Sequence, residues 1–223
     1  MANHLDLEEQ EQLDQLKHFW QQYGNLISWL LIAVLGAFAS WNFYNYWQRQ
    51  QATQAAAMYD EVERVARSGD LPKLDRAWAD MKDKFSSTTY AQQAGLMAAK
   101  VYFSAGKTEQ TESTLAWVAE KASDEGYRAI AKLRLAGVLL EAKSYDQALK
   151  QLAGSFPAEF KPLVADRMAD IYLQQGNATQ AVQHYQQAYK GLDERVEYRR
   201  LVEVKLNALG VNPREDQAKE NSK

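Results

Sequence analysis

Cysteine and the familiar catalytic motifs are missing from this sequence of 223 residues. Without cysteine, disulfide bonds, thiolate metal ligands and cysteine nucleophiles are excluded, and the chain suits an oxidising compartment. No glycine-rich phosphate loop, HExxH or GxSxG motif occurs. The three histidines, His4, His18 and His184, are scattered, and His184 falls on a polar helix face where a solvated side chain is expected. The sequence therefore predicts a protein that is not an enzyme and has no cofactor, metal site or small-molecule substrate.

Proline is scarce, and the alternation of apolar and polar residues that marks a strand is hard to find. The four prolines fall at expected element boundaries. Apolar residues recur at helical spacing instead, as at Ala131, Leu135, Val138 and Leu139. These patterns predict an all-α fold.

Charge is nearly balanced over most of the chain but not at its start. The net charge of −3 gives no strong attraction to nucleic acid or to acidic lipid, so we expect no nucleic-acid partner. Residues 1–47 carry one base, Lys17, and five acids: Asp6, Glu8, Glu9, Glu11 and Asp14. The other 24 acids and 25 bases lie in 48–223. The acidity is therefore confined to an N-terminal segment, residues 1–25.

One stretch, from Phe19 to Gln48, has no charge at all. Its apolar centre, Leu26 to Trp47, has 22 residues and as a helix would reach about 33 Å, enough to cross a hydrocarbon core of about 30 Å. Tyrosine and tryptophan gather near both ends, as expected at the two interfaces of a lipid bilayer. The sequence therefore predicts a transmembrane helix over 26–47.

This stretch has two other interpretations. Ala37-Phe38-Ala39 is similar to a signal-peptide cleavage site, but the preceding region is long and acidic, whereas a signal peptide starts short and basic. A buried core helix would not explain aromatic residues at both ends. Lys17 before the stretch and Arg49 after it leave the orientation open. The candidate contacts with a partner helix are two pairs of small residues: Ala33 with Ala37, and Gly36 with Ser40.

Short turns recur beyond this stretch at a regular interval. They lie at "SGD" (68–70), "AGK" (105–107), "AKS" (142–144) and "QGN" (175–177), so their centres are 37, 37 and 33 residues apart. A tetratricopeptide repeat, which is a helix–turn–helix unit, has a period of about 34 residues. A generic helical bundle is the alternative, but the regular spacing favours a tetratricopeptide-like solenoid of helical hairpins over 48–209.

The contact positions of such repeats are occupied by small and aromatic residues. The unit "VADRMADIYLQQGNATQAVQHYQQAYKG" fits best, with Ala169, Tyr172, Ala181, Tyr185 and Ala188 at these positions. In the preceding unit, Ala148 is expected at a helix–helix contact. A last helix over 195–209 is expected to close the stack and to bury Leu201, Val204 and Leu206. The charged tail, 210–223, is expected to be disordered.

The first helices of such hairpins line a groove that can bind a protein segment. The repeat register assigns these candidates to the groove: Leu96, Lys100, Phe103, Leu133, Leu140, Asp166, Asp170 and Leu173. Some tetratricopeptide domains hold a C-terminal carboxylate with a Lys/Asn clamp, which is absent here. A mixed apolar and acidic groove suits a helix or an unfolded segment better. The alternative is that the leucines are only core. Asp166 and Asp170, at positions i and i+4, have the geometry of a catalytic carboxylate pair, but a solvated or groove-lining pair is favoured.

In the order and spacing of several segments, the chain resembles the YfgM-type ancillary subunits of the SecYEG translocon of Gram-negative bacteria. The segments are "QLKHFWQQYGN", "FYNYWQRQQATQAAAMYDEV", "TYAQQAGLMAAK", "AKLRLAGVLL" and "LVADRMADIYLQQGN". The resemblance implies a single-pass protein of the bacterial inner membrane, with its N-terminus in the cytoplasm and its tetratricopeptide-like domain in the periplasm.

The resemblance also implies partners. These are the SecYEG translocon, the lipid bilayer, exported unfolded polypeptides and a periplasmic chaperone similar to PpiD, to which the exported proteins are passed. It further implies restraint of the Rcs envelope-stress regulator. A scaffold for the assembly of another envelope complex is the alternative function.

Overall fold

The computed structural model describes residues 7–214, which are helical apart from short connections. This part of the chain contains no strand, which confirms the predicted all-α fold. The helices are α1 (Leu7–Ser68), α2 (Leu71–Phe85), α3 (Thr89–Ser104), α4 (Thr108–Lys121), α5 (Glu125–Glu141), α6 (Tyr145–Leu152), α7 (Lys161–Gln174), α8 (Ala178–Gly191) and α9 (Tyr198–Ala208), with a 3-10 turn, η1 (Ala158–Phe160), before α7.

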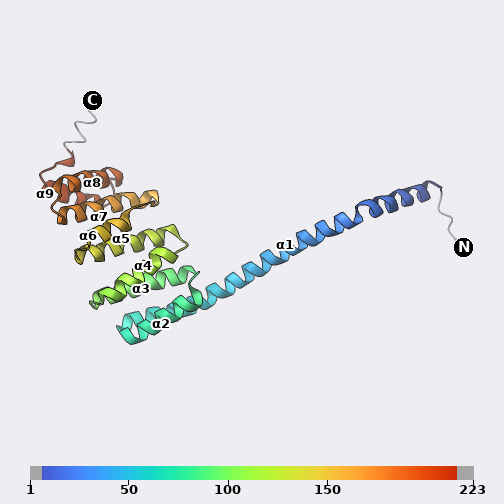
Figure 1. Cartoon of the computed structure of the whole chain (residues 1–223), viewed down its shortest axis with the longest axis horizontal. Helices are drawn as coiled ribbons and strands as arrows, with labels where there is room; N and C mark the ends of the chain where they lie inside the picture. The colour runs from blue at the N-terminus through green and yellow to red at the C-terminus, as the bar shows by residue number, and fades with distance from the viewer. Residues whose placement is uncertain (1–6, 215–223) are drawn as a thin grey trace, which may run out of the picture. The chain divides into compact units, whose positions relative to one another are not determined.

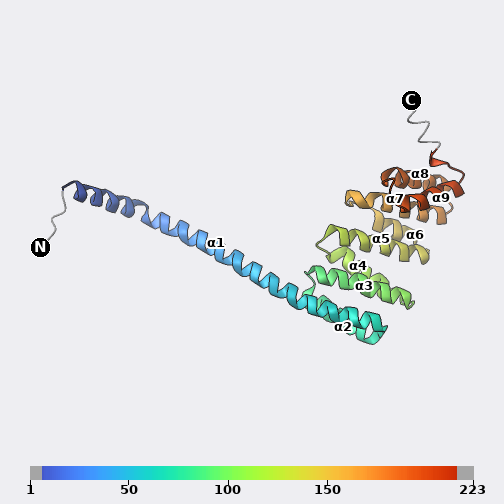
Figure 2. The ribbon, with the colours of Figure 1, turned by 180° about the vertical axis from the view of Figure 1, so that it is seen from behind.

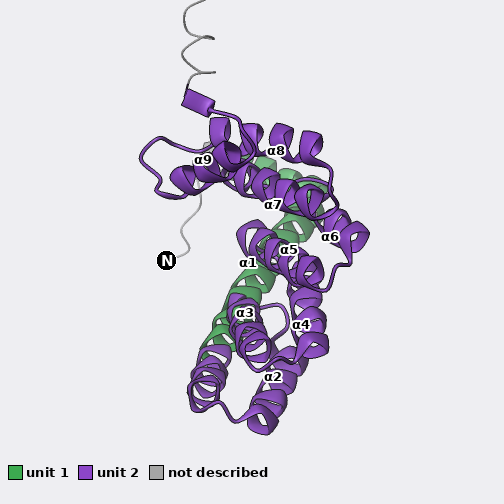
Figure 3. Cartoon of the chain, turned by 90° about the vertical axis from the view of Figure 1, so that its left-hand side faces the viewer, with its two compact units in different colours: residues 1–53 green, residues 54–223 purple. Residues whose placement is uncertain are grey.

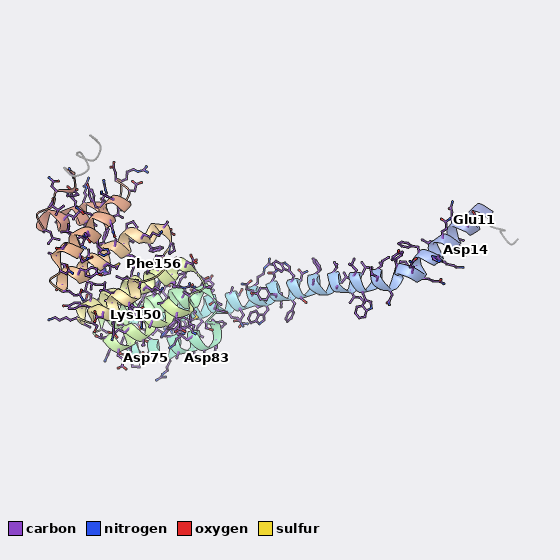
Figure 4. The ribbon with its side chains drawn as sticks, turned by 45° about the horizontal axis from the view of Figure 1, so that its top comes forward. Glu11, Asp14, Asp75, Asp83, Lys150 and Phe156 are labelled. Carbon is purple, nitrogen blue, oxygen red and sulfur yellow. The ribbon has the colours of Figure 1, made fainter. Side chains whose placement is uncertain are left out.

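The chain divides into two compact units, residues 1–53 and residues 54–223 (Figure 3). The first unit holds the N-terminal part of α1, where Glu11 and Asp14 lie toward the beginning of the helix (Figure 4). The uncharged stretch is part of this helix, its apolar window has a mean hydropathy of 1.8, and none of that window is buried. A membrane span accounts for so much exposed apolar surface, whereas a core helix does not.

Two polar side chains within the stretch bond to the carbonyl groups of their own helix. The Ser40 hydroxyl donates to the carbonyl oxygen of Gly36 at 2.8 Å, and the Asn42 amide donates to that of Phe38 at 3.1 Å. In hydrocarbon no water would satisfy these donors, so the bond to the preceding turn lowers the cost of placing them there.

In the second unit, α2 to α9 follow one another as a stack of helical hairpins (Figure 1, Figure 2). Helices α3 with α4, α5 with α6 and α7 with α8 form successive hairpins, and the C-terminal part of α1 shares one apolar core with α2 and α3. Helix α9 packs on α8. Each hairpin buries its apolar face against the next, as a solenoid requires. The predicted tetratricopeptide-like architecture is confirmed.

The four predicted turns share one backbone conformation. Gly69, Gly106, Lys143 and Gly176 follow α1, α3, α5 and α7 respectively, and their φ angles lie between 58° and 78°. In the last three turns, the next residue donates a backbone hydrogen bond back to the helix, as from Lys107 to the Tyr102 carbonyl at 2.8 Å. This left-handed cap strains a residue with a Cβ, so glycine suits it and Lys143 is the exception. The regular interval in the sequence is therefore an interval between helix ends.

Small residues set the distance between helices in the stack. Ala148, Ala169, Ala181 and Ala188 are all 0% exposed, which confirms the contact positions expected from the repeat register. Tyr185, on the same helix as Ala181 and Ala188, is 1% exposed.

The last helix, α9, buries a different face from the one that the sequence predicted. Leu206 is buried as expected, and Val202 one turn earlier is buried with it. Leu201 and Val204, which were expected in the core, are 47% and 61% exposed, so their assignment was wrong. Residues spaced four apart share a helix face, and the pair 202/206 rather than 201/204 faces α8.

The tail expected to be disordered lies mostly outside the described residues. Of its first residues, Val211 packs against the last core cluster and Pro213 is buried. Arg214 forms an ion pair with Glu203 of α9, with Nε and Oε1 2.7 Å apart. Residues 210–214 therefore stay in contact with the stack.

Candidate functional site

An open groove of about 350 Å³ lies among α3, α4, α5 and α7. Helix α3 contributes Lys100 and Phe103, α5 contributes Arg134 and Glu141, and α7 contributes Arg167. The first four of these side chains are exposed, and Arg167 is half-buried. Because α3, α5 and α7 are the first helices of successive hairpins, the groove crosses three neighbouring repeats.

The inner surface of the groove is apolar. Ala99, Leu115 and Val138 are at most 7% exposed and form part of its lining. Gly137 lies among them, and a Cβ atom added there would meet nothing nearer than the Arg167 guanidinium, at 3.8 to 4.0 Å. The missing side chain at position 137 thus leaves space in the groove.

Phe103 is a large apolar side chain that remains 46% exposed beside this lining. Isolated exposed apolar residues are common on protein surfaces, but an aromatic ring next to an apolar hollow is a suitable contact for a partner's side chain. The groove can therefore bind apolar groups without rearrangement of the stack.

Cations outnumber anions around the groove. Lys100, Arg134 and Arg167 are positively charged, and Glu141 is the one acid among the lining residues. Within the part of the chain that the structure describes, Arg134 makes a single hydrogen bond, from Nη1 to the Leu96 carbonyl at 3.4 Å. Within residues 7–214, Lys100 forms no ion pair. A guanidinium has five N–H donors, so most of the hydrogen-bonding capacity here is unused.

Only two of the eight predicted groove residues, Lys100 and Phe103, line this groove. Leu96 is 7% exposed and belongs to the central core cluster, and Leu133 and Leu140 are half-buried against that cluster. Leu173 is 37% exposed but is not part of the lining. The leucines of α3 and α5 thus pack the stack together, as the alternative interpretation held.

The residues that the sequence reasoning missed lie one position further along. The register assigned Leu133, Leu140 and Asp166 to the groove, and the lining residues are Arg134, Glu141 and Arg167. One residue turns a helix by about 100°, which moves a side chain from the core boundary to the open side. The signal was present, because charged residues follow each of these positions.

The two aspartates belong to a buried polar cluster that joins α7, α8 and α9. Asp166 is 1% exposed and accepts hydrogen bonds from the Tyr198 hydroxyl at 2.6 Å and from the Lys205 ammonium at 2.9 and 3.0 Å. Asp170 accepts from the Tyr185 hydroxyl at 2.6 Å and from the same ammonium at 2.8 Å. One cation thus holds two carboxylates and ties α9 to the last hairpin.

The phenols of this cluster are firmly protonated. Burial, together with the hydrogen bond to Asp170, raises the pKa of Tyr185 above its usual range. Burial and the bond to Asp166 raise the pKa of Tyr198 in the same way. Each phenol therefore keeps its proton and donates a hydrogen bond to a carboxylate. Asp166 and Asp170 thus form a structural lock rather than an acid–base site or a solvated pair.

His184 is not the solvated residue that was expected. Its ring stacks on Tyr172 with centroids 5.2 Å apart, and its Nδ1 is buried without a hydrogen-bond partner. Burial lowers the pKa of His184, which favours the neutral ring in the folded state. Within the described residues, no group of three or more His, Asp and Glu side chains could hold a metal ion.

On the first unit, the small residues proposed for a partner helix lie in the α-helical stretch, with open space beside Gly36. An added Cβ there would have no side chain within 4 Å. Whether a second helix binds at Ala33, Gly36, Ala37 and Ser40 stays a prediction.

Comparison with known proteins gives two findings. Residues 17–211 match the family described as tetratricopeptide repeat-like domain. Curated proteins named ancillary SecYEG translocon subunit are similar over almost their whole length. The one from Neisseria gonorrhoeae is 32% identical over 210 residues, which is 94% of this chain and 100% of the relative.

Two further relatives carry the same name. The protein of Escherichia coli is 25% identical and that of Haemophilus influenzae 26% identical, each over 91% of this chain and over 97% and 98% of the relative. No solved structure matches the chain.

Proposed function

The chain belongs to the tetratricopeptide repeat-like family that includes the curated ancillary SecYEG translocon subunits, as the resemblance predicted, and on this premise we propose that it is a membrane-anchored adaptor of the SecYEG translocon. The match to the relative from Neisseria gonorrhoeae covers 94% of this chain, so it extends over both the apolar helix and the hairpin stack described here. The observation that carries the proposal is the combination of a bare apolar helix with a hairpin stack that has an open groove.

In this proposal the apolar helix spans the bacterial inner membrane once, with the N-terminus in the cytoplasm and the hairpin stack in the periplasm. The exposed apolar surface of the helix supports the anchor, and the resemblance supports the orientation. Exported, unfolded polypeptides bind to the adaptor at the groove and are passed to a PpiD-like chaperone. This transfer uses protein–protein binding, without catalysis. The same anchored chain would restrain the Rcs regulator.

The orientation has a direct test. Protease added to spheroplasts is expected to digest the hairpin stack and to leave the acidic segment before the span intact, as detected with antibodies against each part. The mature chain should also keep its first residues and stay in the membrane through a carbonate wash. Protection of the stack, or an N-terminus at Ser40 in mass spectrometry, would contradict this topology.

The adaptor role is tested by recovering the tagged full chain from detergent-solubilised membranes. We expect SecY and the PpiD-like chaperone to be recovered with it. Phe103→Asp should reduce recovery of the chaperone about tenfold, because a charge replaces the exposed ring of the groove, at a cost of about 1.4 kcal/mol in binding.

Val204→Asp is the matched control, because Val204 is 61% exposed on α9 and does not line the groove. It should leave recovery unchanged, and both variants should melt at the same temperature as the native chain by circular dichroism. Recovery of a different envelope assembly, without SecY, would instead support the alternative of a scaffold for another complex.

A further inference from the structure

The groove combines two chemical features that together specify an occupant. Its lining is apolar at Ala99, Leu115 and Val138, and Phe103 presents an exposed ring beside them. The nearest neighbour of a Cβ atom added at Gly137 would be the Arg167 guanidinium, at 3.8 to 4.0 Å. One large apolar side chain of a partner can fill this space and cover the ring.

The second feature is the charge around this space. The lining residues include three cations, Lys100 on α3, Arg134 on α5 and Arg167 on α7, and one acid, Glu141, which is an excess of two positive charges within the lining. Arg167 has a weak partner, since its Nη1 lies 3.6 Å from Oδ2 of Asp170. Among the described residues, Arg134 bonds to a carbonyl group and to no carboxylate. Lys100 and Arg134 are therefore available to carboxylates from outside, and Arg167 is held only by this longer contact.

The two acids of α7 near the groove are held mainly by Lys205 and not by the groove cations. Asp166 is buried, and both it and Asp170 are bound to the Lys205 ammonium at 2.8 to 3.0 Å. The groove is thus apolar and basic, whereas the sequence had indicated an apolar and acidic one. Like charges are excluded and opposite charges attracted at such a surface.

We propose that the groove binds an acidic peptide segment of a partner protein, with a large apolar side chain seated over Gly137 and flanking carboxylates paired with Lys100, Arg134 and Arg167. This rests on the proposed function and names the chemistry of the segment that the adaptor recognises. The volume of about 350 Å³ is at the lower end of ligand pockets. It holds one or two side chains, and the open sides let a peptide continue across the neighbouring hairpins.

The experiment uses the full chain in detergent micelles and labelled peptides, with fluorescence anisotropy as the measurement. The probe is a peptide with a Leu-Phe pair flanked by glutamates on both sides. One matched peptide replaces each glutamate by lysine, and another replaces the Leu-Phe pair by two serines. The native chain should bind the acidic probe at least tenfold more tightly than either matched peptide.

Charge reversal tests the assignment of the cations. The double variant Lys100→Glu, Arg134→Glu should lose this preference and bind the lysine peptide more tightly than the acidic probe. The double variant Lys150→Glu, Lys161→Glu changes the net charge by the same amount as Lys100→Glu, Arg134→Glu, but at positions outside the groove. Lys150 lies on α6 (Figure 4), and Lys161 is the first residue of α7. It should bind as the native chain does, which controls for detergent and for net charge.

A third variant tests the apolar site without a change of charge. Gly137→Leu places a side chain over the groove, where the added Cβ meets the Arg167 guanidinium at ordinary contact distances, and leucine has a higher helix propensity than glycine. Circular dichroism of this variant checks that the helical fold is kept. Binding of the acidic probe should weaken at least tenfold. Equal binding of acidic and lysine peptides by the native chain, or an unchanged preference in Lys100→Glu, Arg134→Glu, would overturn the proposal.

Failure of this inference can be separated from failure of the adaptor role. A chain that recovers SecY from membranes but has no preference for the acidic probe contradicts the ligand chemistry alone. A chain that prefers the acidic probe but recovers neither SecY nor a chaperone supports the ligand chemistry and contradicts the adaptor role.

Discussion

Replacing Lys205 by methionine is expected to lower the free energy of unfolding by about 3 kcal/mol. The ammonium bonds to Asp166 and Asp170, which stand one helical turn apart on α7, and Asp166 is 1% exposed. Without the cation, two carboxylates remain close together in a poorly solvated site and repel each other. Methionine keeps most of the apolar volume of the lysine side chain. The decrease in the free energy of unfolding therefore measures the contribution of the charge and its hydrogen bonds.

The measurement is urea denaturation of the full chain followed by circular dichroism, with hydrogen exchange to locate the change. Amides of α9 should lose protection first, because the cluster is its polar attachment to α7. Lys205→Arg, which keeps the charge, should cost less than Lys205→Met. Lys150→Met, at an exposed lysine, should change stability by less than about 0.5 kcal/mol. If Lys205→Met lowered the free energy of unfolding no more than Lys150→Met, the cluster would not be what holds α9 to α7.

Gly95 is expected to be the position least tolerant of a side chain. A Cβ atom there would lie 2.5 Å from Val118 Cγ2 of α4 and 2.8 Å from Trp78 Cη2 of α2. Both neighbours are buried, and Trp78 is also held edge-on against Trp117 with ring centroids 5.1 Å apart. Gly95→Ala should lower the free energy of unfolding by about 3 kcal/mol through overpacking, and Gly95→Val by more.

Gly137→Ala provides the matched control, because both glycines lie inside helices of the same stack. Its added Cβ finds only ordinary contact distances of 3.8 Å or more. Alanine is favoured over glycine in a helix interior, so the free energy of unfolding should rise by about 0.5 to 1 kcal/mol. Thermal melts of the two alanine variants should therefore move in opposite directions. Melts that move together would show that α2, α3 and α4 do not meet at Gly95 as closely as the structure shows.

Local sequence patterns were sufficient for the helical architecture. The left-handed cap at Gly69, Gly106 and Gly176 requires a residue that tolerates positive φ, so the end of each first helix is visible in the sequence. Ala148 and Ala181 were identifiable as contacts because a close helix crossing needs a small side chain wherever its partner lies. The uncharged stretch was identifiable because length and apolarity alone define a candidate span.

The groove could be predicted only in part. Of the predicted residues, Lys100 and Phe103 line the groove, whereas on α5 and α7 the lining residues lie one position after Leu133, Leu140 and Asp166. Which of these residues bind a partner stays a prediction. A repeat period of 33 to 37 residues does not fix the rotation of each helix to within one residue, which is about 100°. The exact rotation follows from how the side chains of neighbouring hairpins pack.

By itself, then, the sequence determined the all-α class, the hairpin boundaries and the apolar helix, because each depends on residues close together in the chain. Only the tertiary structure decided the charge of the groove. Lys205 is 39 residues from Asp166 and 35 from Asp170, and their pairing removes both acids from the open surface. No local pattern encodes that pairing, since it exists only after α9 has folded back onto α7 and α8.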